Sequence, residues 1–451
     1  MTGPLVTVVV LNYNGAERIP GVLRSLAAQD LPEGQVAVWV VDNASADGSL
    51  ELLARDFPWV RTIPNPTNDG FAGGNNVALR EIDTPFVALL NDDAYPSADW
   101  LRRLLEPLQQ PGGERVAAVS SKIVFLPRFL PVELSTAGFK PNTLDTRTLG
   151  VRLYRVSVDG RDVTDQVLWD RVGYGPEGEG AGRFRWTRPA GMLLVPVNGD
   201  AGRPRRLGLR LAADDAAKPV DLVWPGGGAT VKAERDPSDV DVEVPGDVAL
   251  VDVLNNAGGM VFRDGYGADR AYQELDRGQY QRPEEVFTFC GGAVLLRTEA
   301  LREAGLFDED FFLYYEDTDL SWRLRAFGWS IRYQPSALVR HIHSASSVEW
   351  SPLFTFHTDR NRLLMLTKNA RASLAVREVL RYPVTTVKYI GRDLLRARYA
   401  RRRPPVRPTL LRLRVLGSYL RLLPKMLVRR RRLAARARVD RKHLERWLVL
   451  R

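Results

Sequence analysis

The chain has 451 residues, of which 45% are hydrophobic, so it is too long for one ordinary core and too apolar for a disordered protein. A single cysteine, Cys290, excludes an internal disulfide, and no uncharged apolar stretch approaches the roughly 18 residues that a membrane-spanning helix needs. The net charge of +10 conceals two regions, because residues 371–451 hold 25 Lys and Arg against 4 Asp and Glu, whereas the remainder has a net charge of −11.

The first 125 residues alternate between strand-like and helix-like segments. The opening, MTGPLVTVVVLNYNGAER, has no basic segment before its apolar run, which indicates a first strand rather than a signal peptide. Apolar runs over 5–13 and 35–43 alternate with helical periodicity over 16–29 and 47–57. This order predicts a parallel, doubly wound sheet, in which ligands lie beyond the carboxyl ends of the strands. Those ends carry NYN (12–14), DNAS (42–45) and NDDA (91–94).

The middle of the chain has a different pattern. Short runs of alternating hydrophobicity, such as VRLYRVSV and DVDVEV, are separated by turn residues, and their spacing predicts a β-sandwich insert. The α/β pattern resumes near residue 251 and continues to about residue 370. We therefore expect four regions: 1–140, one half of an α/β domain; 145–250, the β-rich insert; 251–370, the other half of that domain; and 371–451, a basic amphipathic helical tail.

Two adjacent acids, Asp92 and Asp93, end a strand predicted to be buried, where they are costly to desolvate unless a cation neutralises them. A hard divalent ion such as Mg²⁺ or Mn²⁺ prefers oxygen ligands of this kind. The alternative is an Asx turn that caps the next helix. Downstream, His341 and His343 alternate in VRHIHSASS, so on a strand they project from one face, either as metal ligands or as a satisfied surface pair.

Asp42 lies just past a predicted strand in VVDNASADGS. A carboxylate at that position can accept hydrogen bonds from a base or ribose, whereas the alternative is helix capping by its neighbours. The segment NDGFAGGNN (68–76) offers glycines that let a ligand approach the backbone and asparagines that can bond it. A tight turn feeding a helix explains that segment equally well.

Paired glycines, Gly291 and Gly292, precede an apolar strand in FCGGAVLLR. They remove side chains where a sugar-sized ligand can lie close to the backbone. A bulge or a packing requirement explains them about as well.

The segment FFLYYEDTDLSWRLRAFGW places Glu316, Asp317 and Asp319 directly behind a block of aromatics. An apolar wall raises the pKa of a nearby carboxylate, as a general base working near neutrality requires. The alternative is that these acids only stabilise the first turn of a helix. Because Asp317 and Asp319 are two residues apart, they do not share a helix face, so one can face a cleft while the other caps the helix or pairs with Arg323 or Arg325.

The basic tail interleaves apolar residues with arginines, as in LLRLRVLGSYLRLLPKMLVRRRRLAARARV. This pattern favours an amphipathic helical region that lies on an anionic membrane surface. A plain solvated hairpin is an alternative. Binding of nucleic acid through phosphates is disfavoured, because no nucleic-acid-binding motif appears.

In combination, these motifs resemble the family-2 inverting glycosyltransferases of the GT-A fold, in particular rhamnosyltransferase-like members that build bacterial surface polysaccharides. The resemblance covers residues 5–125 and 250–370 and rests on LNYNG, VDNASADGS, NDGFAGGNN, LLNDDA, GGAVLLR, GLFDEDFFLYYEDTDLSWRLRAFGW and ALVRHIHSASS. It implies an α/β, Rossmann-like, mostly parallel sheet, in which 1–140 is the nucleotide-sugar-binding half and 251–370 is the acceptor-binding and catalytic half. The β-sandwich-like insert and the basic helical tail are additions to this sheet. The resemblance gives the insert no role.

The resemblance also implies roles for single residues. Asp317 would be the general base, in a catalytic pair with Glu316. Asn91 occupies the first position of the metal motif, so Asp93 would be the direct metal ligand, with His341 as the second. The residues expected around the nucleotide are Asn12, Asn14, Asp42, Asn68, Gly73, Asn75 and Asp92. Those expected around the acceptor and sugar are Gly291, Gly292, Tyr315 and Trp322.

The implied activity is metal-dependent inverting transfer from a nucleotide-diphosphate sugar to a glycan or lipid-linked acceptor, in the synthesis of cell-surface polysaccharide. The implied cofactor is Mg²⁺ or Mn²⁺. We expect a cytoplasmic protein that is peripherally associated with the inner face of the membrane. The competing hypothesis is a non-catalytic carbohydrate-binding protein with a degenerate transferase domain.

Overall fold

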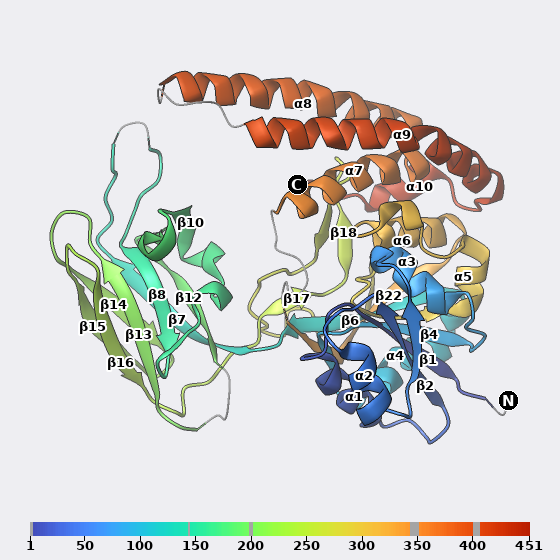
Figure 1. Ribbon diagram of the computed structural model, residues 1–451, viewed down its shortest axis with the longest axis horizontal. Coiled ribbons are helices and arrows are strands. Elements are labelled where there is room, and N and C mark those ends of the chain that lie inside the picture. The colour runs from blue at the N-terminus through green and yellow to red at the C-terminus, as the bar shows by residue number, and fades with distance from the viewer. Residues whose placement is uncertain (1–2, 143–144, 198–201, 343–350, 400–405) are drawn as a thin grey trace. The chain divides into compact units, whose positions relative to one another are not determined.

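The computed structural model describes residues 3–142, 145–197, 202–342, 351–399 and 406–451. The chain divides into two compact units, traced in Figure 1. The α/β unit comprises Met1–Val124, Leu254–Tyr272 and Gly278–Arg451, and the β unit comprises Phe125–Val253 and Gln273–Arg277.

Four parallel strands form one half of the central sheet of the α/β unit, in the order β4-β1-β2-β3. In β1, Val8 and Val10 pack into one buried cluster, whereas Val9 packs into another. Successive side chains point to opposite faces, so a strand covered on both faces requires the continuous apolar run seen in the sequence. The bounds are β1 Val6–Asn12, β2 Val36–Asn43, β3 Arg61–Asn65 and β4 Phe86–Asn91; the helices are α1 Ile19–Ala27, α2 Ser49–Asp56, α3 Gly70–Leu79 and α4 Trp100–Gln109.

Strands from distant parts of the sequence complete this ten-stranded sheet, whose main path is β20-β22-β6-β21-β4-β1-β2-β3. Strand β21 lies between β4 and β6 and is antiparallel to both. The sheet is therefore parallel on one side and mixed on the other. The bounds are β5 Ala94–Pro96, β6 Val116–Phe125, β17 Leu254–Asn256, β20 Glu284–Glu285, β21 Ala293–Arg297 and β22 Ser330–His341; a separate hairpin pairs β18 Gly259–Val261 with β19 Gly267–Asp269.

Helices make up most of the remainder of the α/β unit. Two of them, α8 and α9, are long neighbouring helices of the basic tail (Figure 1). None of the described helices combines the length and the hydropathy that crossing a bilayer requires. The bounds are α5 Thr298–Ala304, α6 Glu316–Ala326, α7 Pro352–Asn369, α8 Ala372–Tyr399, α9 Val406–Arg436 and α10 Arg441–Leu444.

The β unit consists of two antiparallel sheets around one core. Val132 and Leu134 from one sheet share a buried cluster with Leu207 and Leu209 from the other. The predicted α/β class, the β-sandwich-like addition and the helical tail are thus confirmed. The bounds are β7 Arg128–Thr136, β8 Arg152–Val158, β9 Arg161–Asp162, β10 Gly173–Glu177, β11 Phe184–Thr187, β12 Ala190–Val197, β13 Arg205–Ala212, β14 Lys218–Trp224, β15 Gly227–Ala233 and β16 Ser238–Val244.

This compact unit begins earlier than the stretch 145–250 in which the sequence predicts an insert. The reason is β7, which pairs with β12 and β14 and so belongs to one of the two sheets. Its pattern of buried residues continues from β6 with little break in hydrophobicity, so composition alone gives no boundary at Phe125.

A buried ion cluster anchors helix α6. Asp319 is fully buried, and its carboxylate accepts bonds from Arg323 Nε at 2.9 Å, Lys368 Nζ at 2.8 Å and Asn369 Nδ2 at 2.8 Å. Burial alone would raise the pKa of Asp319, but the charges of Lys368 and Arg323 lower it to about 2. The expected pairing of one acid with a following arginine is confirmed for Asp319 and Arg323. Asp319 therefore holds α6 against α7.

We predict that Asp319→Asn destabilises the α/β unit by about 3 kcal/mol at pH 7, because it leaves Lys368 and Arg323 buried without their carboxylate. A folded-state pKa of about 2 contributes stability that is present above the unfolded value of about 4 and is lost as the pH falls through 2. The difference from wild type should therefore shrink between about pH 4 and pH 2.

Thermal unfolding at pH 7 and across this acid range measures the effect. Asp56→Asn is the matched control, because Asp56 is exposed and its pair with Arg55 is worth little. An Asp319→Asn protein with the wild-type midpoint at pH 7, or with a deficit that does not change with acid, would contradict this role.

Candidate functional site

The carboxyl ends of β1 and β2 are tied together by side-chain bonds. Asn12 Nδ2 donates to Asp42 Oδ1 at 2.7 Å, and the Ser45 backbone N–H donates to Asp42 Oδ2 at 3.0 Å. Asn14 joins the same loops, because its N–H donates to Ser45 Oγ and its Oδ1 accepts from Ala46. Both oxygens of the buried Asp42 are thus engaged within the loops. Asn12 Oδ1, in contrast, is buried without a partner among the described residues.

In the segment 68–76, the three residues expected near the nucleotide all have local structural contacts. Asn68 Oδ1 accepts from Asn43 Nδ2 and from the Gly70 N–H, both at 2.9 Å. Asn75 is buried and donates to the Phe71 carbonyl at 2.9 Å. A Cβ at Gly73 would lie 2.6 Å from Asp69 Cβ. These residues shape the entry to α3, at the same edge of the sheet.

Asp92 is held by the loop after β1. Its Oδ2 pairs with Arg18 at 2.7 Å, and burial together with the neighbouring Asp93 raises the pKa of Asp92 to about 6. Gly15 makes this approach possible, since a Cβ there would lie 2.3 Å from both Asp92 Oδ2 and Asn12 Oδ1. The glycine of LNYNG is therefore required by packing against the acidic pair.

Asp93 and His341 meet because β5 and β22 pair with Ala94 opposite His341. Asp93 Oδ1 lies 3.0 Å from His341 Nε2, and His341 Nδ1 lies 3.2 Å from Asn255 Oδ1. Because Asn255 Oδ1 can only accept, His341 Nδ1 carries a proton in this contact, and the neutral imidazole then has its lone pair on Nε2. A carboxylate oxygen and an imidazole lone pair thus converge, and Asn255, which orients the ring, was not singled out from the sequence.

These two groups suit a divalent ion that takes its other ligands from phosphate and water. Within the described ranges, no cluster of three or more His, Cys, Asp or Glu side chains could hold a metal by itself. The predicted alternative ligand, His343, lies outside the described residues.

The paired glycines connect this region to Asp317. The Asn91 N–H donates to the Gly292 carbonyl at 3.0 Å, and a Cβ at Gly292 would lie 3.2 Å from Asn91 Nδ2. The Gly291 N–H donates to Asp317 Oδ2 at 3.3 Å, and a Cβ at Gly291 would lie 2.9 Å from the Phe71 ring. The glycines therefore allow close packing on both sides and bring Asp317 to the edge of the sheet that carries Asn91.

The three acids of the aromatic block have three different environments. Asp319 is enclosed by cations, as described above, whereas Asp317 is only half-buried. Burial raises the pKa of Asp317 even though the Thr318 and Gly291 N–H groups bond its carboxylate. Glu316 is buried, its Oε2 has no partner among the described residues, and burial beside Asp317 raises its pKa well above the usual range. Of these three acids, Asp317 is the one that solvent or substrate can reach.

A strained turn leads into these acids. Phe312, Tyr314 and Tyr315 have φ values of 65°, 66° and 69°, a region that bulky residues rarely adopt. Asn361 holds the turn, because its buried Nδ2 donates to the carbonyls of Phe311, Leu313 and Tyr314 at 2.7–2.9 Å. The sequence analysis missed Asn361, which lies between Arg360 and Arg362 in HTDRNRLLMLTKN and has no distinct signal in the sequence.

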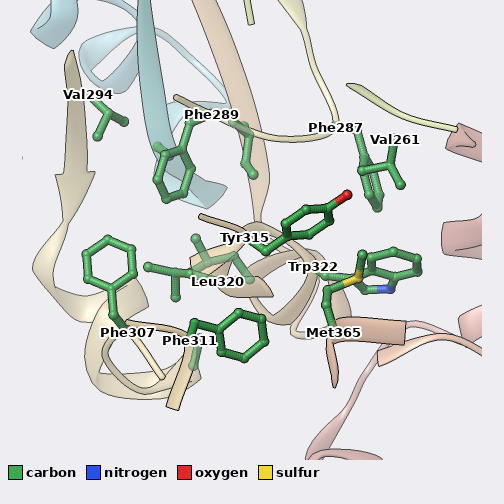
Figure 2. Close-up of a cluster of buried hydrophobic side chains, with 14 of the residues drawn as sticks. Val261, Phe287, Phe289, Val294, Phe307, Phe311, Tyr315, Leu320, Trp322 and Met365 are labelled. Carbon is green, nitrogen blue, oxygen red and sulfur yellow. The ribbon is translucent and has the colours of Figure 1, made fainter. Parts of the chain in front are cut away.

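Tyr315 and Trp322, which are expected around the acceptor and sugar, are both buried in the structure. Figure 2 shows both rings inside a cluster of buried hydrophobic side chains. Trp322 is fully buried and packs edge-on against Phe287, with ring centroids 5.2 Å apart. Tyr315 is also buried, and its hydroxyl bonds Gly267 and Gly265. Both residues therefore belong to the hydrophobic core, whereas Asp317, between them in the sequence, is only half-buried.

Two family models match the chain. Residues 7–142 match the model described as glycosyl transferase family 2, and residues 250–357 match that of glycosyl transferase family group 2. Together they cover more than half of the chain and leave out most of the β unit and the basic tail.

Named relatives match shorter segments. Glycosyltransferase AglE of Haloferax volcanii is 29% identical over 119 residues, which are 26% of this chain and 39% of that protein. The N-acetylglucosaminyl-diphospho-decaprenol L-rhamnosyltransferase of Mycobacterium tuberculosis is 40% identical over 82 residues, which are 18% of this chain and 26% of that protein. The chain thus spans well under two thirds of the length of these relatives.

Among solved structures, TarS residues 1–349 of Staphylococcus aureus in complex with UDP align with a TM-score of 0.39 at 14% identity, over 98% of this chain and 86% of that one. The two family models match the same halves of the chain that build the central sheet and carry Asp93 and Asp317. The chain belongs to glycosyltransferase family 2.

Proposed function

We propose that this glycosyltransferase transfers a sugar from a nucleoside-diphosphate sugar to an acceptor hydroxyl with inversion, and that Asp317 is its general base. The observation that carries the proposal is the environment of Asp317. It is the half-buried acid of its block, its pKa is raised by burial, and the Gly291 N–H orients its carboxylate at the edge of the sheet. A base of raised pKa that substrate can reach is what proton removal from a hydroxyl near neutrality requires.

In the proposed reaction, a carboxylate oxygen of Asp317 takes the proton of the acceptor hydroxyl. The acceptor oxygen then forms its bond to the anomeric carbon on the face opposite the diphosphate. The bond between that carbon and the diphosphate oxygen breaks, and the nucleoside diphosphate leaves with the electron pair. Attack from the opposite face inverts the anomeric configuration. Buried Glu316 is the other acid of the catalytic pair, and burial beside Asp317 favours its neutral form.

For the donor, we propose the loops that follow β1, β2 and β3, because ligands of such sheets lie beyond the carboxyl ends of the parallel strands. Asn12, Asn14 and Asp42 would shape the nucleotide pocket, and the unpartnered Asn12 Oδ1 supports a ligand contact there. Asn68, Gly73, Asn75 and Asp92 would support these loops. The rhamnosyltransferase match supports rhamnose as the first donor sugar to test.

Asp93 and His341 would hold Mg²⁺ or Mn²⁺, since the carboxylate oxygen and the Nε2 lone pair already face each other. When bound, such an ion offsets charge that develops on the leaving diphosphate. Gly291 and Gly292 would lie near the acceptor sugar at the same edge, where the Gly291 N–H orients Asp317.

We further propose an anionic membrane surface as a partner, at the inner face of the cytoplasmic membrane, with a lipid-linked or glycan acceptor of a cell-surface polysaccharide. Most of the exposed large hydrophobic side chains of the described residues lie on α8 and α9. They recur at intervals of three, four or seven residues and are flanked by arginines, as in a helix that lies in a lipid headgroup layer. These stripes are Val376, Leu380, Val384, Val387 and Leu394 on α8, and Val406, Leu410, Leu413, Leu420 and Leu427 on α9.

Asp317→Asn should lower turnover by about 10²–10⁴-fold and leave the donor affinity unchanged, because the amide keeps the shape but cannot accept the proton. Release of nucleoside diphosphate from a panel of nucleotide sugars, including a rhamnose donor, measures this. Glu309→Gln is the control, since Glu309 is an exposed acid of the preceding loop. Wild-type turnover in the Asp317→Asn protein would refute the assignment.

Asp93→Ala should weaken the binding of nucleoside diphosphate in the presence of Mn²⁺, because one of two protein ligands is lost. Titration calorimetry with Mn²⁺ and with EDTA separates the contribution of the metal from that of the protein. Wild type should bind nucleoside diphosphate more weakly in EDTA than in Mn²⁺, and the variant should bind it weakly under both conditions. Equal wild-type affinity under the two conditions would count against a metal at this site.

The full chain should float with vesicles that contain anionic phosphatidylglycerol. Flotation should be stronger at low salt than at high salt, because each basic residue near the lipid contributes about 1 kcal/mol of electrostatic binding energy. Replacing Leu380, Val387, Leu410 and Leu420 by Ser should abolish flotation while the charge is unchanged. Failure of the wild-type chain to float with anionic vesicles, or equal flotation of the Ser variant, would exclude this surface as the membrane contact.

A further inference from the structure

Salt bridges connect helix α9 of the basic tail to the loop that precedes Glu316 and Asp317. Arg429 Nη1 contacts Asp308 Oδ1 at 2.6 Å and Oδ2 at 2.8 Å, and it also pairs with Asp310. Lys425, one turn earlier on α9, pairs with Asp310 at 2.7 Å. The Asp308 side chain is only 4% exposed, so its charge depends on the cations that reach it.

One of those cations is shared with the catalytic helix. Lys368 Nζ contacts Asp308 Oδ2 at 2.7 Å and Asp319 Oδ2 at 2.8 Å, and all three side chains are at most 5% exposed. A single ammonium group therefore neutralises part of two buried carboxylates. Arg429 provides the additional positive charge that neutralises Asp308, and Arg323 provides it for Asp319.

We infer that Arg429 is a positioning residue for Asp317, and that the tail for which we propose membrane contact is also a structural part of the catalytic site. This inference rests on the proposed role of Asp317. Without Arg429, Asp308 has Lys368 as its main neutralising partner, and the ammonium group is drawn from Asp319 toward Asp308. Asp319 and Asp317 lie on the first turn of the same helix, so α6 loses a restraint directly beside the base.

The route from the tail to the base is short. Asp308 caps the turn Glu309–Phe311, and the Phe311 carbonyl is one of those held by Asn361 in the strained segment before Glu316. A shift of the Asp308 carboxylate is thus transmitted both through this segment and through Lys368 to α6. Membrane contact of α9 would act on the same network, because Arg429 projects from the helix that carries the exposed apolar stripe.

Two measurements on the full chain, without vesicles, test the inference. In Arg429→Met, amide hydrogen exchange over residues 316–326 should become faster than in wild type. Arg432→Met removes the same charge from an exposed position of α9 and should leave that exchange unchanged.

Turnover of the nucleotide-sugar donor in Arg429→Met should fall by about 10-fold or more, with an unchanged donor KM. This loss lies within the ~10²-fold that a 1 Å misplacement of a reacting group can cost. Arg429→Lys, which retains the charge, should restore most of both.

The coupling is checked by combining Arg429→Met with Asp308→Asn. If Arg429 acts through Asp308, the double variant should lose no more turnover than the worse of the single variants. Wild-type exchange over 316–326 in Arg429→Met, or an exchange rate equal to that of Arg432→Met, overturns the inference. Because the exchange measurement needs no turnover, failure of the proposed reaction, seen as full activity of Asp317→Asn, is distinguishable from failure of this coupling.

Discussion

The antiparallel pairing of β21 between β4 and β6 is the constraint on which the site depends. It places Gly291 and Gly292, which are far from Asn91 in the sequence, directly beside the end of β4. Gly291 and Gly292 have no side chains, and a Cβ at either position would crowd the side chain of Phe71 or Asn91. Glycine is therefore what allows the backbone to pack this closely. The polar ends of the parallel strands and the acidic helix α6 meet across these two residues.

Burial then sorts the carboxylates by the partners available to each. Asp319 is surrounded by two cations and an amide, so it remains ionised and holds the helix. Glu316 is buried and no cation among the described residues compensates its charge, so its neutral form is favoured. Asp317 lies between these extremes, half-buried and bonded by backbone N–H groups. Neighbouring acids of one short segment thus differ in their ionisation because burial and charge compensation differ around each of them.

The basic tail has two faces with different surroundings. One face packs on α7 and supplies Arg429 to the buried network around Asp308, whereas the other leaves apolar side chains such as Leu380 and Leu410 exposed. An arginine that is paired with a buried carboxylate is not free to neutralise lipid headgroups. Net charge alone therefore overstates how many of the tail's cations are available to the proposed membrane contact, and the exposed apolar stripes are the more specific support for that proposal.

The sequence by itself determined the elements and most of the residues at the edge of the sheet. Continuous apolar runs require strands buried on both faces, and polar residues directly after them, such as Asn12 and Asp93, must lie at one edge of a parallel sheet. The tertiary structure alone decided which residues are enclosed. Trp322 and Tyr315 adjoin the acids in sequence yet belong to the core, and Asn361, distant in sequence, holds the turn before Glu316. The reason is physical: periodicity reports the face of an element, whereas exposure and charge compensation depend on what other elements pack against that face.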